Sequence, residues 1–346
     1  MAAKSRIEKI KELFPSEPAF RLRQIDAALF DPQIRTWSDI STLPQTMREQ
    51  LTAFMPFMTV DAVMVQSDRS GQTYKALLRI DGDATVETVL MKNSRGAWTI
   101  CVSSQVGCAM RCAFCATGRL GLKRNLTSDE IVDQYRFWQQ YLVDHEELGS
   151  RISNIVYMGM GEPLANYENV KTSLNNLLAN TDIGKTRITV STAGVMPRLE
   201  QLLEDPDWPH VRLAVSLHSA NELTRRSIMP SSYEGFLHDL KVWSRQYLKK
   251  FGNRRHHLTF EYILLAGVND NQSDADELAK YVRKIGNVRI NLIPYNFTGD
   301  DFFGSDQQTI NDFQQRLMNQ GVTVTVRKSL GQDIAAACGQ LAKNEK

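Results

Sequence analysis

The chain has 346 residues, of which 42% are hydrophobic and 23% are charged, and its formal net charge is +2. These values are ordinary for a soluble globular protein of one large domain or two smaller ones, and they neither demand nor exclude a nucleic-acid partner. No apolar run approaches the roughly 18 residues of a membrane span, and the first residues lack the apolar stretch of a secretion signal, so we expect a cytoplasmic protein that binds no membrane.

The first part of the chain, residues 1–57, has a helical pattern. Apolar residues such as Ile7, Ile10 and Leu13 recur at intervals of three or four positions. Prolines at positions 15, 18, 32 and 44 divide this part into short helices. We therefore predict a helical accessory domain over residues 1–57.

Alternation of apolar and polar residues replaces the helical pattern after about residue 60. It is clear in residues 75–80 and 85–91, and the run Asp-Gly-Asp at 81–83 between them is typical of a hairpin turn. We assign residues 58–93 to a small β extension that links the helical domain to the rest of the chain.

The remainder, residues 94–346, repeats strand, loop and helix. A capping box at residues 127–130 marks the start of the first long helix. This alternation predicts an α/β fold with a parallel sheet or a partial barrel. Strands are expected near residues 155–158, 187–190, 211–216, 258–264, 288–293 and 322–326.

Three cysteines, Cys108, Cys112 and Cys115, lie in the loop between a predicted strand and the first long helix. A closed zinc site needs four ligands and usually takes its second pair from further along the chain, where this sequence has no such pair. Three thiolates can instead hold a [4Fe-4S] cluster and leave one iron open to a small molecule. The spacing C-x-x-x-C-x-x-C therefore favours an iron-sulfur cluster.

This spacing resembles that of the radical S-adenosylmethionine (SAM) superfamily. The resemblance implies a partial (βα)6 barrel in which the open iron binds SAM and an electron from the cluster cleaves it to a 5′-deoxyadenosyl radical. Glycines 159 and 161 would let the backbone approach the methionine part of SAM, and Glu162 would accept its ammonium protons. Other readings remain, since a serine can cap a helix and a histidine can be a satisfied core residue. Our SAM-binding candidates follow predicted strands and are Gly161, Glu162, Ser191, Ser216, Leu217, His218 and Asn296.

Two cysteines remain, Cys101 and Cys338. Cys338 lies among alanines and glycines near the end of the chain, where a free cysteine is often a small buried apolar residue. The small neighbours also leave it room to approach another sulfur, as a catalytic thiol must. Cys101 lies in the strand that leads into the cluster loop and is its natural partner.

With these residues in place, the chain resembles the RlmN/Cfr family of radical SAM adenine methyltransferases. The matching runs are residues 101–108, 158–164, 216–218, 291–294 and 337–341, so the similarity spans nearly the whole chain.

The resemblance implies a methyl-carrying role for the outer cysteines. Cys338 would take a methyl group from one SAM, and a second SAM would supply the radical that turns this group into a methylene radical. The methylene would add to an adenine ring carbon, and Cys101 would then attack the sulfur of Cys338. The disulfide releases the methylated base, and an external electron donor such as flavodoxin must restore both thiols.

The family also has a glutamate that removes the ring proton, and its match is Glu87. By pattern alone Glu87 is typical of a solvated strand residue, because it alternates with apolar neighbours. Only the resemblance makes it a catalytic base.

The partner implied by the resemblance is 23S ribosomal RNA and, in some members, tRNA, with residues 1–57 similar to a helix-hairpin-helix RNA binder. An adenine must be unstacked to reach the pocket, so basic residues should surround the opening. The candidates are Arg119, Lys123, Arg124, Arg245, Lys249, Lys250, Arg254, Arg255, Arg327 and Lys328.

Three alternatives stay open. One family branch methylates C2 of an adenosine and the other methylates C8 and confers antibiotic resistance; Glu162-Pro163 resembles the first, and the run at residues 20–25 resembles the second. We favour C2. The other two alternatives are a radical SAM enzyme with a protein substrate and a non-enzymatic RNA-binding or electron-carrier module with a structural metal.

Overall fold

The computed structural model describes residues 4–80, 82–93, 95–149, 151–253, 258–299 and 302–342. Its main sheet has ten strands in the order β1-β2-β3-β4-β7-β8-β9-β10-β11-β12, and β5 and β6 pair separately. The strands are β1 (Asp61–Ser67), β2 (Thr73–Arg79), β3 (Thr85–Lys92), β4 (Trp98–Cys101), β5 (Gln105–Gly107), β6 (Leu122–Asn125), β7 (Ile152–Tyr157), β8 (Ile188–Thr192), β9 (Arg212–Ser216), β10 (Leu258–Leu264), β11 (Val288–Pro294) and β12 (Thr323–Val326).

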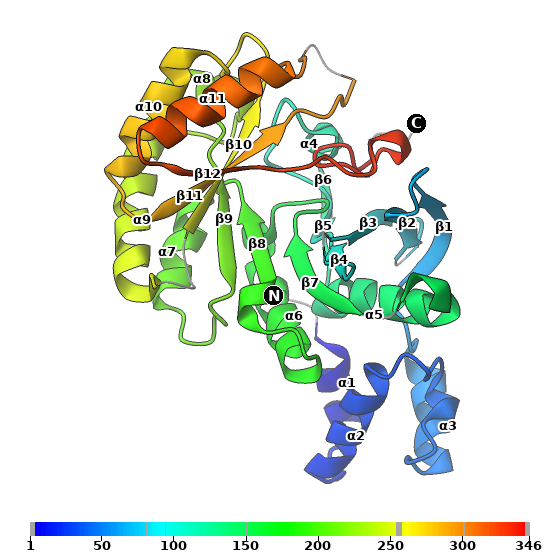
Figure 1. Cartoon of the computed structure of the whole chain (residues 1–346). Coiled ribbons are helices and arrows are strands. Elements are labelled where there is room, and N and C mark those ends of the chain that lie inside the picture. Colours follow the sequence, from blue (N-terminus) through cyan, green and yellow to red (C-terminus); the bar gives the residue numbers. More distant parts are fainter. Residues whose placement is uncertain are drawn as a thin grey trace.

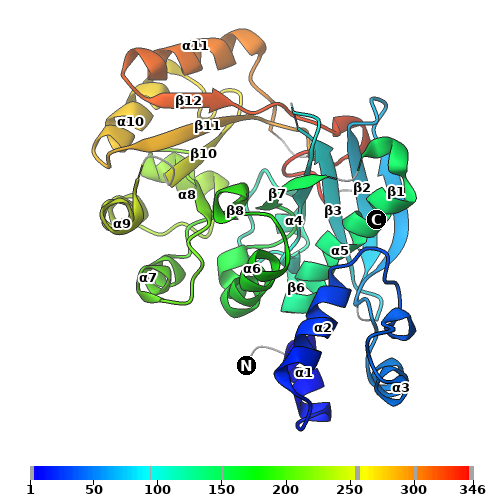
Figure 2. The same ribbon diagram turned by 60° about the horizontal axis from the view of Figure 1, so that its bottom comes forward.

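Helices cover the outer face of the curved sheet, as Figures 1 and 2 show. The helices are α1 (Arg6–Leu13), α2 (Ala19–Leu29), α3 (Gln45–Phe54), α4 (Ala116–Arg119), α5 (Ser128–Asp144), α6 (Tyr167–Asn180), α7 (Met196–Glu204), α8 (Glu222–Ile228), α9 (Phe236–Phe251), α10 (Gln272–Arg283) and α11 (Gln307–Asn319). Among the described residues, no helix is long and apolar enough to cross a membrane.

The parallel part of the sheet confirms the predicted α/β fold. From β4 to β12 each neighbouring pair is parallel, and the six strands expected between residues 155 and 326 are all present as β7 to β12. The units from β4 to α11 form the partial (βα)6 barrel, to which β12 is added. Strand β10 is almost wholly buried, as expected for a strand covered on both faces.

The predicted β extension is also present, as an antiparallel meander of β1, β2 and β3 that continues into β4. In the hairpin of β2 and β3, Thr73 pairs with Met91 and Arg79 with Thr85. The expected turn at 81–83 includes Asp81, which lies outside the described residues; residues 82 and 83 form a turn.

Helices α1 to α3 bury an apolar cluster of their own, which includes Ile10, Ile25 and Leu51. The capping box predicted at residues 127–130 starts α5, with Thr127 Oγ1 accepting from Glu130 N and a Glu130 carboxylate oxygen accepting from Thr127 N. The division into domains at residues 57 and 93 stays a prediction.

A buried group of charges joins the N-terminal helices to α5. The Asp133 carboxylate, which is fully buried, pairs with Arg6 at 2.6 Å and with Arg136 at 2.5 Å. The Arg136 guanidinium also donates to the carbonyls of Leu29 and Phe57. Burial alone would raise the pKa of the Asp133 carboxyl, but the two arginines hold it well below its ordinary range. Asp133 therefore fixes the N-terminal helices to α5 and the sheet.

We predict that Asp133→Ala lowers the free energy of unfolding by about 3–5 kcal/mol, because it leaves two buried guanidinium groups without their carboxylate. Urea denaturation measures this loss. Asp144→Ala is the control, since Asp144 pairs with Arg35 at an exposed position, and it should cost less than about 1 kcal/mol. Equal losses in the two variants would contradict the assignment.

Candidate functional site

A cavity opens where the parallel strands end. Its wall includes Met158 after β7, Ser191 in β8, Ser216 in β9, Glu261 in β10 and Arg327 after β12. In an open α/β sheet, ligands bind outside the carboxyl ends of the strands. The sheet topology therefore directs side chains from five strands toward one site.

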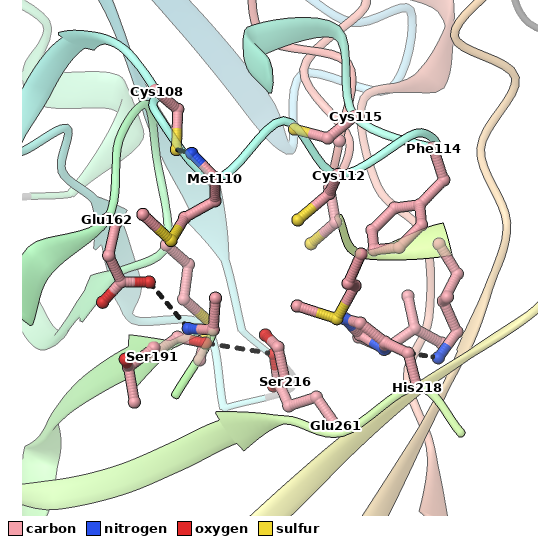
Figure 3. A pocket seen from close by; sticks show the side chains of 18 of the residues that line it. Cys108, Met110, Cys112, Phe114, Cys115, Glu162, Ser191, Ser216, His218 and Glu261 are labelled. Atoms are coloured by element: carbon pink, nitrogen blue, oxygen red, sulfur yellow. Dashed lines mark hydrogen bonds between the residues drawn. The ribbon is translucent and has the colours of Figure 1, made fainter. Parts of the chain in front are cut away.

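Cys108, Cys112 and Cys115 all line this cavity, on the loop between β5 and α4 (Figure 3). Burial raises the pKa of all three thiols, that of Cys108 to about 12. Thiolates form here when a metal centre displaces the protons, because a coordinating thiol is deprotonated by the metal charge. Three thiols facing one cavity are a donor set that fits an iron-sulfur cluster with one iron left open.

Gly107 fixes the path of the chain into the cysteine loop. Its φ is +74°, and a Cβ atom at this position would lie 1.8 Å from the carbonyl oxygen of Gly121. The close approach allows Cys108 N to donate to that same oxygen at 3.0 Å. A larger residue at position 107 would separate β5 from β6 and displace the first cysteine.

The loop after β7 packs directly on the segment that leads to the cysteines. A Cβ atom at Gly161, where φ is +101°, would lie 2.5 Å from Gln105 Cβ, and one at Gly159 would lie 2.7 Å from the Val102 oxygen. We predicted that these glycines let the backbone approach a ligand. The close contact between the two loops also requires them. Both glycines line the cavity as well.

Glu162 lies in the cavity wall and is almost fully buried. Its carboxylate accepts from Ala193 N at 2.6 Å and from Leu164 N at 3.0 Å. Burial raises the pKa of Glu162, and these backbone donors oppose the shift. The two bonds fix the carboxylate between the loops that follow β7 and β8.

The candidates on β8 and β9 have different surroundings. Ser191 Oγ donates to Glu261 Oε2 at 3.5 Å, and Ser216 lies beside them in the wall (Figure 3). His218 also lines the cavity; its Nδ1 accepts from Ile263 N, and its ring meets the Phe114 ring edge-on. The Leu217 side chain is fully buried in the main core and does not line the cavity, and its backbone N–H donates to the Glu261 carbonyl oxygen.

Arg225 holds the ends of β8 and β9 together. Its guanidinium is buried and donates to the carbonyl oxygens of Leu217, Ala193 and Ser216. The guanidinium also lies over the Phe236 ring, 3.7 Å from its centroid. Sequence analysis missed this residue, because nothing in the local pattern distinguishes it from a surface arginine on α8.

A second cavity adjoins the first and contains the outer cysteines. Cys101 and Asn296 line it together with Cys338, and Cys338 lines both cavities. Both cysteines are free thiols, and burial raises the pKa of Cys101 to about 12. Asn296, expected at SAM, lies in this second cavity and holds the C-terminal segment: its Nδ2 donates to the Cys338 oxygen at 3.2 Å.

Glu87 is buried, with 5% of its surface exposed, so the solvated position that its sequence pattern indicates is wrong. Its carboxylate pairs with Lys75 at 2.9 Å and accepts from Ala342 N at 2.5 Å. The C-terminal segment covers this part of β3, and no local pattern around position 87 reveals a cover from so far along the chain. Glu87 lines neither cavity.

Arg327 was expected at the opening as a phosphate contact, but it lies in the walls of both cavities. Its Nη1 donates to Glu261 Oε1 at 3.0 Å. The Cys338 sulfur, and after it the Glu261 carboxylate, raises the pKa of Arg327 despite burial. The sequence does contain a signal for this pair, since Glu261 is the one charged residue in the apolar strand 258–264.

Several of the other basic candidates already have protein partners. Arg124 pairs with Glu130, Lys250 pairs with Glu204, and Arg119 donates to the Thr298 oxygen. Arg254 and Arg255 lie outside the described residues. A phosphate-binding role for this group stays a prediction.

His218 gives a prediction about pH. Burial lowers its pKa from 6.5 to about 3, so the unfolded chain binds this proton more readily and the folded protein loses stability as pH falls from 6.5 toward 3. Between pH 7.5 and pH 5 the loss from this group is about 2 kcal/mol.

Urea denaturation of His218→Gln at both pH values should show a difference smaller by that amount. His238→Gln, on the exposed face of α9, is the control and should leave the difference unchanged. An unaltered pH dependence in His218→Gln would show that this histidine does not titrate abnormally.

Comparisons with known proteins agree with this geometry. The radical SAM superfamily matches the chain over residues 102–282. A probable dual-specificity RNA methyltransferase RlmN from Dictyoglomus turgidum is 39% identical over 328 residues, which cover 94% of this chain and 91% of that relative. A dual-specificity RNA methyltransferase RlmN from Solidesulfovibrio magneticus is 41% identical over 329 residues, with the same two coverages.

Among solved structures, a radical SAM methyltransferase from Sphaerobacter thermophilus has a TM-score of 0.90 and 37% identity, covering 99% of this chain and 100% of that one. Membership of the superfamily implies SAM and a [4Fe-4S] cluster, for which the three cysteines are present. The predicted methyltransferase activity is confirmed at the level of the family. The chain belongs to the radical SAM superfamily and, within it, to the RlmN family of RNA methyltransferases.

Proposed function

We propose that this enzyme methylates C2 of an adenosine in 23S ribosomal RNA, and an adenosine in tRNA, through an S-methylcysteine at Cys338. The observation that carries the proposal is the position of Cys338 in the walls of both cavities. One cavity contains the three clustered thiols, and the other contains Cys101 together with Cys115. The relatives named dual-specificity RNA methyltransferases support two RNA substrates.

Cys108, Cys112 and Cys115 would hold the cluster, and the surrounding loops would hold SAM through Glu162, Ser191, Ser216 and His218. When bound, the cluster supplies the electron that generates the 5′-deoxyadenosyl radical from SAM. The buried Glu162 carboxylate is a suitable acceptor for an ammonium group, because each of its oxygens takes one backbone donor and keeps further lone pairs.

Cys338 would act twice. Its sulfur would first attack the methyl carbon of SAM, form an S–C bond and lose the thiol proton, while S-adenosylhomocysteine leaves. After the 5′-deoxyadenosyl radical has taken a hydrogen atom from this methyl group, the methylene carbon would bond to C2 of adenine and Glu87 would take the C2 proton. The unpaired electron of the adduct would return to the cluster. Cys101 then attacks the Cys338 sulfur; the S–C bond breaks, the carbon keeps the electron pair and gains a proton, and a disulfide forms. An external donor such as flavodoxin returns two electrons to the disulfide.

The accessory helices at residues 1–57 would bind the RNA, and the β extension at residues 58–93 would carry Glu87 to the catalytic part at 94–346. These RNA substrates make the cytoplasm the expected location. Methylation at C8 is the competing outcome, and the product itself distinguishes the two.

Cys338 is the proposed methyl carrier. Cys338→Ala should reduce RNA methylation about a thousandfold or more, because the atom that carries the methyl group is removed. Mass spectrometry of adenosines from treated 23S RNA measures the product and separates 2-methyl from 8-methyladenosine. A Cys338→Ala enzyme that still methylates RNA would disprove the carrier, and 8-methyladenosine from the wild type would disprove the C2 assignment.

Cys108, Cys112 and Cys115 are the proposed ligands of the cluster. Anaerobic reconstitution should give about four irons per chain in the wild type and fewer than about one in Cys112→Ala. Cys101→Ala is the matched control, since it removes a thiol from the adjoining cavity, and it should keep its iron. Equal iron content in the two variants would contradict the division of the five cysteines into three ligands and a redox pair.

A further inference from the structure

A buried ion pair links the two central strands of the β extension. Lys75 on β2 and Glu87 on β3 are diagonal neighbours, because Lys75 is opposite Val89 and Glu87 is opposite Leu77 in the hairpin. Their charged atoms lie 2.9 Å apart, and 3% and 7% of the two side chains are exposed. A lysine and a glutamate are rarely buried this completely unless they are paired.

Each member of the pair also holds one end of the loop that carries Cys338. Lys75 Nζ donates to the Ala335 oxygen at 3.4 Å, and Glu87 Oε2 accepts from Ala342 N at 2.5 Å. The Cys338 loop, which we define as residues 335–342, therefore begins at the lysine and ends at the glutamate. In Figure 1 this red segment runs between α4 and the strands of the β extension.

The two held residues have an unfavourable backbone conformation. Ala335 has a φ of 51° and Ala342 a φ of 69°, which is the left-handed region that residues with a Cβ atom rarely adopt. Such conformations persist only where the surrounding contacts impose them. The contacts to Lys75 and Glu87 supply this constraint at the two ends, while Asn296 and Ala116 N–H hold the Cys338 and Gly339 oxygens in the middle of the loop.

The closed arrangement leaves Glu87 unable to act as a base. Lys75 occupies Oε1, Ala342 N–H occupies Oε2, and the carboxylate lines neither cavity. An adenine ring can reach this buried carboxylate only after the segment around Ala342, which covers it, has moved aside. Glu87 is therefore accessible as a base only when the Cys338 loop has opened.

We propose that Lys75 is a positioning residue that clamps the Cys338 loop while RNA is absent and orients Glu87 toward adenine when RNA opens the loop. Opening breaks the bonds at Ala335 and Ala342, and the Lys75 contact at Oε1 keeps Oε2 directed at the space that Ala342 vacates. This role rests on the proposed function of Glu87 and Cys338 and adds a residue that touches neither RNA nor SAM.

Lys75→Met tests the clamp in the cluster-loaded enzyme without RNA. Hydrogen exchange at the amides of residues 336–342, and alkylation of Cys338 by iodoacetamide, should each become about tenfold faster, because the Ala335 end loses its donor and the Ala342 end loses the lysine that orients Glu87. Arg79→Met is the matched control on the exposed end of the same strand and should change neither rate. Lys75→Arg keeps the charge and should restore most of the protection.

The double variant Lys75→Met/Glu87→Gln covers the case in which an unpaired buried carboxylate prevents folding. It keeps the packing without either charge, and it should show the same fast exchange. Unchanged exchange in a folded Lys75→Met or double variant would overturn the clamp. These measurements use no RNA, so they are independent of whether the enzyme makes methyladenosine.

Addition of 23S ribosomal RNA tests the second half of the proposal. RNA should speed exchange at Ala342 in the wild type, and Lys75→Met should lower kcat about tenfold with little change in KM for RNA, since Lys75 orients the base without binding substrate. Slower exchange at Ala342 with RNA, or a change in KM alone, would overturn the opening step. Failure of the wild type to methylate any RNA would instead reject the proposed function. The exchange measurements without RNA would still decide whether Lys75 clamps the loop.

Discussion

Parallel hydrogen bonding from β4 to β12 brings the carboxyl ends of seven strands to one edge of the sheet. The wall of the first cavity depends on this constraint, because four of its side chains lie in or directly after β8, β9, β10 and β12. Ser191, Ser216, Glu261 and Arg327 are far apart in the chain and meet in one wall. Arg225 strengthens the arrangement by binding the carbonyls that follow β8 and β9.

Buried ion pairs connect the N-terminal helices and the Cys338 loop to the rest of the fold. Arg6, Arg136 and Asp133 join the first helices to α5, and Lys75 with Glu87 joins the β extension to the Cys338 loop. Desolvation makes such groups unfavourable unless the charges are paired, so each ion pair is kept together. These pairs hold segments that are remote in sequence against one another.

The sequence predicted those features that depend on local patterns. Strands β7 to β12 follow from their apolar runs, and the donor set of Cys108, Cys112 and Cys115 follows from spacing. It failed at Glu87 and Arg327, which a local pattern assigns to solvent. Both have partners from elsewhere in the chain: the C-terminal segment around Ala342 covers Glu87, and Glu261 in β10 pairs with Arg327. Lys75 and Arg225 were missed for the same reason, since each acts through backbone carbonyls that no side-chain motif reveals.

Helix α5 has a consequence for the choice of substrate. Its first turn follows β6, the partner of the strand that enters the cysteine loop, while its middle is bonded to the accessory helices through Asp133 and Arg136. One helix therefore links the proposed RNA-binding helices to the strands beside the cysteine loop. If those helices bind RNA as proposed, the length of α5 sets the distance between the bound RNA and the reaction centre.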